Sequence, residues 1–350
     1  MAYTTIDDPS VYFQIALYTG NDSSNAITND GNSDLQPDWL WTKNRSSSAD
    51  HKIFDSTRGV TKFLESNTND AEGTQANLLS SFNSDGFTLG AGGETNSSST
   101  NYVAWQWKAN GGSRTTFTES GDNPGGGYQA NTTAGFSIVD FVGTGANGTV
   151  QHGLGVAPRW YIIKNRDRSA NWQVYHEDNG NTHYIKLNGT GAKLDNHEIF
   201  NDTSPTSSVF SVGIDQSVNF NGENHIAYVF AEIQGYSKFG SYTGNGNADG
   251  PFVYTGFKPA WLLIRRTDSA QNWNLHDNKR STFNTTKADL FPNLSNAEET
   301  GNGNFIDFLS NGFKHRASTN SLNASSGDFI YMAFAEHPFV SSEGVPTTAR

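Results

Sequence analysis

The chain has 350 residues, a formal net charge of −12 and no cysteine. Without cysteine, disulfide and thiolate chemistry are excluded, and the acidic balance argues against nucleic-acid binding, which needs a basic surface. The length predicts two or three domains, and the aromatic content of 13% against only 34% hydrophobic residues predicts a core built largely from big rings.

One pattern occurs three times along the chain. It consists of a proline, any residue, a tryptophan, three mostly apolar residues and then a lysine or arginine. The copies lie at 37–45, 158–166 and 259–266, with the tryptophans Trp39, Trp160 and Trp261. Repetition at the spacing of a domain, instead of the ~20–50 residues of a solenoid, predicts three copies of one domain. Positions in each copy are counted below from its tryptophan.

Each copy is expected to contain the same strands in the same order. A strand that ends at a glycine comes first, at 13–20, 136–143 and 239–244. The tryptophan strand follows and is apolar on both faces, which is typical of a central strand. The next strand aligns at +12 (His51, Trp172, Trp273) and at +16 (Asp55, His176, Asp277). An aromatic strand closes each copy, at 102–107, 226–232 and 330–336.

Short strands, Gly/Asn-rich turns and no amphipathic helix predict an all-β fold of three tandem β-sandwiches, of jelly-roll, concanavalin-like type. A three-bladed closed array is the competing architecture, and it is disfavoured because a propeller blade needs only ~40–50 residues. The predicted parts are an N-terminal docking segment at 1–12, sandwiches at 13–112, 135–236 and 237–350, and a Gly-rich linker or loop at 113–134.

The sequence offers no defensible catalytic set. The nine histidines lack the spacing of zinc ligands, the Asn/Asp-rich loops depart from the calcium-loop pattern, and no repeated pair of carboxylates marks a glycosidase site. We therefore predict no catalytic residue, no metal and no cofactor, and no enzymatic activity. The basic residues at +4 (Lys43, Lys164, Arg265) are expected to pair with Asp55 and Asp277 or to face solvent, an interaction usually worth ~0–1 kcal/mol.

Aromatic residues are the remaining candidates for binding, because sugars stack on Trp and Tyr rings beside polar Asn side chains. This hypothesis predicts a glycan platform on the second strand of the later copies, formed by Trp172, Tyr175, Trp273 and His276. Packing of the same rings in the core is the competing and favoured interpretation, since a core this poor in aliphatic residues needs them. Recognition of any ligand is expected around +12, +16 and the loops.

The start of the chain lacks the basic and apolar regions of a signal peptide, and no run approaches the ~18 apolar residues of a membrane span. We therefore expect no membrane insertion.

The segments 160–166, 171–176, 239–246 and 330–336 resemble a family of repeat-bearing structural proteins of marine tailed bacteriophages, including cyanophages and pelagiphages. The opening 5–10 and the closing 347–350 are similar to that family too, so the resemblance covers essentially the whole chain. The first copy departs most, with His51 at +12 and Trp107 where the later copies have Glu232 and Glu336.

The resemblance implies a virion component made of lectin-like sandwiches, tail-fibre-like or a capsid appendage, and it assigns no catalytic residue. It implies assembly in the cytoplasm of the bacterial host and a final place in the virion. The expected partners are other virion proteins, host surface polysaccharide and further copies of the chain, with no nucleic acid. The alternatives are a dedicated glycan-binding module for receptor recognition and, less favoured, a polysaccharide-degrading enzyme.

Overall fold

The computed structural model describes residues 2–348 of the chain. Its fold is all-β, with strands paired in antiparallel sheets. The helical elements in this range are single turns: α1 (Gly93–Asn96), α2 (His197–Phe200), α3 (Gln216–Asn219), α4 (Asn320–Asn323), η1 (Pro9–Val11) and η2 (Glu177–Asn179). The all-β prediction is therefore confirmed.

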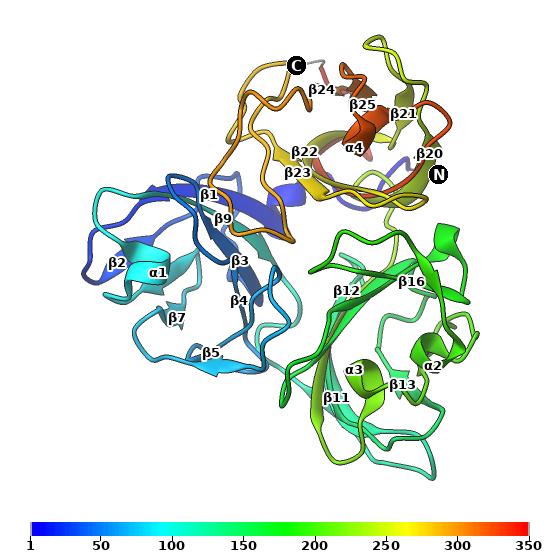
Figure 1. Ribbon diagram of the computed structural model, residues 1–350. Helices are drawn as coiled ribbons and strands as arrows, with labels where there is room; N and C mark the ends of the chain where they lie inside the picture. Colours follow the sequence, from blue (N-terminus) through cyan, green and yellow to red (C-terminus); the bar gives the residue numbers. More distant parts are fainter. Residues whose placement is uncertain (1, 349–350) are drawn as a thin grey trace.

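The chain forms three units, and each unit combines a main sheet with a smaller one (Figure 1). In the first unit the main sheet runs β1 (Phe13–Thr19), β9 (Asn101–Trp107), β3 (Trp39–Asn44), β4 (Lys52–Asp55), and the smaller sheet β2 (Asn25–Ile27), β8 (Phe87–Leu89), β7 (Leu79–Phe82). In the third unit the main sheet runs β20 (Ser237–Thr243), β26 (Asp328–Pro338), β22 (Phe257–Arg266), β23 (Trp273–Asp277), and the smaller sheet β21 (Phe252–Tyr254), β25 (Gly312–His315), β24 (Ile306–Leu309). A short pair, β5 (Lys62–Phe63) and β6 (Gly73–Thr74), follows β4.

The main sheet of the second unit has the same central strands but is longer. Its order is β10 (Thr115–Phe117), β11 (Gly125–Asn131), β12 (Phe136–Val142), β19 (Asn224–Phe230), β14 (Trp160–Asn165), β15 (Gln173–His176), β16 (His183–Lys186), β17 (Leu194–Asp195), and β13 (Gly148–Gln151) pairs with β18 (Val209–Val212) in the smaller sheet. The tryptophan strands β3, β14 and β22 each lie inside their sheet, as predicted.

The Gly-rich region 113–134, predicted to be a linker or loop, instead contributes two strands to the second unit. It contains β10 and β11, which pair with each other and with β12 and so extend the second unit's sheet. Glycine is needed there for close approach and not for flexibility, because a Cβ on Gly126 would lie 2.1 Å from the backbone oxygen of Asp140.

The three main sheets face one another around a common centre (Figure 1). Each unit has its own apolar interior, and a fourth cluster draws residues from all three units and contains all eight tryptophans. Aromatic rings from both units lie close together at each interface between two units, which we call a seam. The ring centroids of Trp39 and Tyr228 are 4.6 Å apart, those of Trp160 and Trp273 5.8 Å, and those of Trp107 and Trp261 5.5 Å. The units therefore form a closed ring, although each is a two-sheet unit and not a propeller blade.

The N-terminal segment, predicted to dock on a partner, lies against the chain itself. The Thr4 hydroxyl donates to the Gln234 carbonyl at 2.8 Å, and the Tyr3 hydroxyl donates to the Gly256 carbonyl at 2.7 Å. Ile6 is buried in the central cluster. The described part of 1–12 thus joins the first unit to the end of the second and to the third, and it helps close the ring.

Candidate functional site

The four residues predicted to form a glycan platform are buried, and that prediction is wrong. Trp172, Trp273 and His276 have no exposed surface and Tyr175 is 2% exposed. They do not share a face either, because the two tryptophans belong to the central cluster, whereas Tyr175 packs inside the second unit. A sugar cannot stack on a covered ring. The competing interpretation, core packing, holds for both tryptophans.

Position +12 joins each unit to its neighbour. The Nε1 of Trp172 donates to the Glu65 carbonyl at 2.8 Å, and the Nε1 of Trp273 donates to the Lys186 carbonyl at 2.9 Å. His51 completes the ring, since its Nε2 lies 3.1 Å from the Phe291 carbonyl oxygen. Burial holds the pKa of His51 well below its ordinary value, so the neutral ring acts here as a smaller substitute for tryptophan.

The basic residues at +4 make the same type of contact, against expectation. The Nζ of Lys43 donates to the Ser295 carbonyl at 3.1 Å and the Nζ of Lys164 to the Asn69 carbonyl at 3.4 Å. Arg265 donates to the Gly191 carbonyl in the same way. Burial lowers the pKa of Lys43 and of Lys164 to about 8. They therefore pair neither with Asp55 or Asp277 nor with solvent.

Position +16 adds buried charge to two of the three seams. Asp55 accepts from Arg58 Nε at 2.5 Å and from the Tyr228 hydroxyl of the second unit at 2.7 Å. Asp277 likewise accepts from Arg280 Nε at 2.5 Å and from Trp105 Nε1 of the first unit at 3.0 Å.

The seam between the second and third units has His176 at +16, and burial lowers the pKa of this histidine to about 4. The Pro-x-Trp signature thus marks the seam between units and not a ligand site.

A polar pocket of about 340 Å³ opens on the third unit beside β23 and α4. Its lining is rich in amides: Gln271, Asn272, Asn274, Phe291, Glu299, Asn302, Asn304, Thr319, Asn320 and Ser321. None of these residues is among the four predicted to form the glycan platform, although Asn272 directly precedes Trp273. The alternation of Asn272 with Asn274 and of Asn302 with Asn304 was the available signal, but it does not show that the two segments meet.

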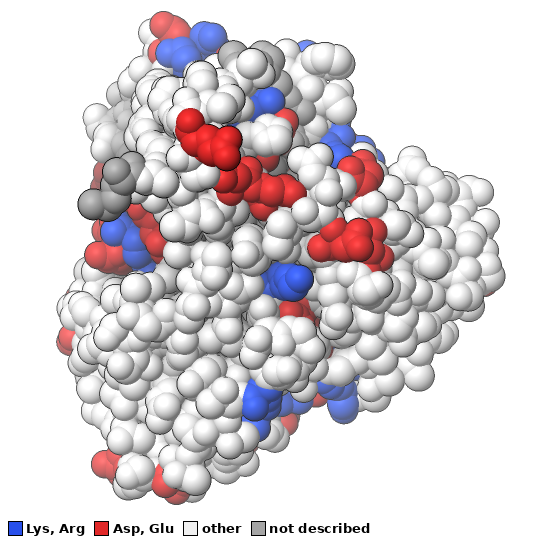
Figure 2. Space-filling view, turned by 180° about the vertical axis from the view of Figure 1, so that it is seen from behind, with Lys and Arg blue, Asp and Glu red and all other residues white. Residues whose placement is uncertain are grey.

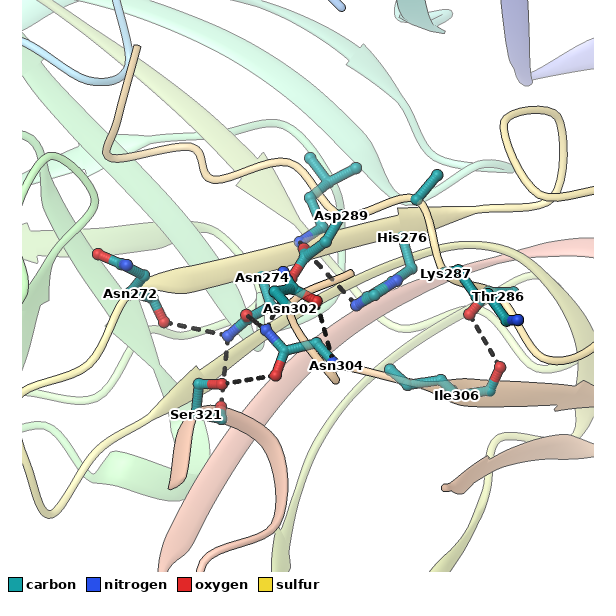
Figure 3. Close-up of polar contacts among 12 residues, drawn as sticks. Asn272, Asn274, His276, Thr286, Lys287, Asp289, Asn302, Asn304, Ile306 and Ser321 are labelled. Atoms are coloured by element: carbon teal, nitrogen blue, oxygen red, sulfur yellow. Dashed lines mark hydrogen bonds and ion pairs between the residues drawn. The ribbon is translucent and has the colours of Figure 1, made fainter. Parts of the chain in front are cut away.

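The floor of this pocket is a network of buried and half-buried side chains (Figure 3). The Nδ2 of Asn304 donates to Asp289 and to Asn274, both at 2.8 Å, and the Nδ2 of Asn302 donates to Asp289 at 3.0 Å. The Oδ1 of Asn304 accepts from the hydroxyls of Thr319 at 2.7 Å and Ser321 at 2.9 Å. With donor and acceptor atoms all engaged, the Asn304 amide has one orientation.

Asp289, which belongs to this network, and His276, which lies beside it, are fully buried. Desolvation by burial raises the pKa of Asp289 to about 7 and lowers the pKa of His276 to about 3. His276 Nε2 is 3.6 Å from Asp289 Oδ1. Between these two pKa values both groups are neutral, so the unit interior carries a polar pair without net charge.

The other two units have aromatic side chains where the third has this polar pair. Equivalent positions in the three units can be identified from backbone pairing at +14. Ile53 pairs with Leu64, Val174 with Ile185 and Leu275 with Leu290. The residue before each of these partners is Phe63, Tyr184 or Asp289, and position +15 is Phe54, Tyr175 or His276. The third unit alone has exchanged a pair of rings for a carboxyl and an imidazole.

The place that corresponds to the pocket of the third unit differs in the other two units. In the first unit, the side chain of Lys52 at +13 fills this place, where it is ion-paired with Glu65 and Glu94 and lies over the Phe63 ring. In the second, a pocket of about 420 Å³ remains, but its lining includes the charged side chains Arg168, Lys186, Glu198 and Asp215. The third unit therefore has the pocket whose lining is mainly uncharged.

Among residues 2–348, no group of three His, Asp or Glu side chains is placed to hold a metal ion. In the same range, no helix has the length and apolar character needed to cross a membrane.

Comparison with curated proteins and with solved structures gave no match. A family model described as a domain of unknown function (DUF7483) matches residues 8–338, which covers all three units. The chain belongs to this family.

Proposed function

We propose that the protein is a structural component of a bacteriophage particle surface, a tail fibre or a capsid appendage, with attachment to the host as a role of the mature particle. In this proposal the three units are lectin-like β-sandwiches of jelly-roll, concanavalin-like type. Its bases are the resemblance to phage structural proteins along the chain and the pairing of a main with a smaller sheet in every unit.

The observation that carries the proposal is the closed ring of seams. Domains joined only by small polar interfaces are expected to move relative to one another. Here the motif that recurs in the sequence is used at +4 and +12 to bind one unit to the next. A body that fixes three units in this way suits a part that must hold its orientation on a particle.

The charge distribution supports protein or polysaccharide partners more than nucleic acid. On the face seen in Figure 2, basic side chains are scattered and several lie beside acidic ones. This face has no continuous basic patch of the kind that phosphate contacts need.

The test is mass spectrometry of purified, salt-washed particles, followed by imaging at domain resolution. We expect the chain among the virion proteins, as three-lobed density at fixed positions on tail or capsid. The proposal is refuted if the chain is abundant in the lysate but absent from the washed particles. A mass measurement in solution decides whether further copies associate.

The enzymatic alternative has a separate test. Incubation with host-envelope polysaccharide is expected to release no new reducing ends, and their appearance would replace the structural proposal with a catalytic one. Glycan recognition, the other alternative, cannot use Trp172, Tyr175, Trp273 or His276, because these side chains are covered.

A further inference from the structure

We propose that the amide-lined pocket of the third unit is a binding site for an uncharged, polyhydroxylated ligand, a neutral sugar residue. The inference rests on the pocket alone and does not depend on where the protein acts. At about 340 Å³, the pocket is at the lower end of the ~300–1,000 Å³ range of small-molecule sites.

The lining chemistry selects the ligand class. Six of the side chains that line the pocket are amides and two are hydroxyls. Each amide presents donors and an acceptor, and each hydroxyl can do both, which matches sugar hydroxyl groups that also donate and accept. The charged side chain in the lining is Glu299, and no Lys or Arg is among the described residues of the lining. An anionic ligand would thus meet a carboxylate without a basic partner.

Part of the lining is already fixed and part is left for a ligand. Asn304 is held by Asp289, Asn274, Thr319 and Ser321 as described above. By contrast, the side chains of Gln271 and Asn320 make no hydrogen bond within residues 2–348, and Asn320 is exposed. A rigid floor with free amides above it is the arrangement that recognition of a polar ligand requires.

The first and second units have equivalent strand pairing without this polar floor. At the position of Asp289 these units have the aromatic residues Phe63 and Tyr184. A buried carboxyl with an asparagine network costs desolvation energy that an aromatic ring does not. The third unit keeps the costlier arrangement, and the open amide pocket lies directly above it.

The test uses the full chain, with saturation-transfer NMR and calorimetric titration. The probes are the methyl glycosides of glucose, galactose and mannose, and glucuronic acid serves as the charged comparison. The variant Gln271→Ala/Asn320→Ala removes two free amides without removing any hydrogen bond within residues 2–348. Gln151→Ala, an exposed glutamine on β13 outside the pocket, is the matched control.

We expect at least one neutral glycoside to bind, and the double variant to weaken that binding by about ten-fold or more. The control should bind as the wild type does, and all variants should keep the same unfolding midpoint. The proposal is overturned if no neutral glycoside transfers saturation at millimolar concentration. It is equally overturned if the double variant binds as tightly as the wild type, or if glucuronic acid binds best.

Discussion

Asp289 lies fully buried where the other two units have an aromatic ring. Burial raises the pKa of this carboxyl from 3.8 to about 7. The folded chain therefore holds the Asp289 proton more tightly than the unfolded chain does. The corresponding stability is present in full below pH 3.8 and is lost as the pH rises through about 7.

Asp289→Asn keeps the shape of the side chain and removes its titration. From pH 4 to pH 8, the unfolding free energy of the wild type should therefore fall by roughly 4 kcal/mol relative to that of the variant, at about 1.4 kcal/mol per pKa unit. Urea unfolding at several pH values measures this difference. Burial lowers the pKa of His276 to about 3, so this residue also makes stability depend on pH, but it does so equally in wild type and variant and cancels in their difference. A difference that stays constant with pH would mean that Asp289 keeps an ordinary pKa.

Composition and pattern could predict that the repeated tryptophans are buried, but not what covers them. A strand that is apolar on both faces needs a layer on each side. The sequence does not tell whether the second layer is the same unit or a neighbour. Trp172 and Trp273 illustrate this, since their Nε1 atoms reach carbonyls that lie far away in the chain, in another unit. The pocket could not be predicted for the same reason, because its amides come from three separate segments.

At the scale of elements, regular strands were predictable and the glycine-rich segment was not. The strands expected at 13–20, 136–143 and 102–107 are found as β1, β12 and β9 within a residue. Gly125–Gly127 has the composition of a flexible linker, and only the nearness of β12 shows that it is a strand. Glycine serves both purposes, and the contact that decides between them is tertiary.

Gly126→Ala tests this element directly. The added methyl group would meet the Asp140 carbonyl at 2.1 Å, so β11 must shift away from β12. We expect a loss of roughly 1–3 kcal/mol in unfolding free energy, as for other overpacked sites. Gly301→Ala is the control, because its Cβ would have no heavy atom within 4 Å. Equal stability of the two variants would show that β11 tolerates a Cβ at this close approach to β12.

At the scale of the whole molecule, the ring couples the three units. The polar contacts of each seam link a unit to the next, and the last unit binds the first through Asp277, Arg280 and Trp105. The family match across 8–338 also treats the units as one. Separate sandwiches on flexible linkers would unfold independently, whereas units that share a central cluster of eight tryptophans should lose that cluster together.

Calorimetry therefore should show one cooperative transition for the full chain, with calorimetric and van't Hoff enthalpies in agreement. Arg280→Ala leaves the buried Asp277 without its partner, which typically costs about 3–5 kcal/mol, and it should lower the midpoint of that entire transition. Arg114→Ala is the matched control, because its pair with Asp140 lies within one unit and is partly exposed; such pairs contribute about 0–1 kcal/mol. Three separate transitions, or a shift in only one of them with Arg280→Ala, would show that the ring does not couple the units. A single shifted transition would mean that the repeated signature has one role: it makes three domains into one body.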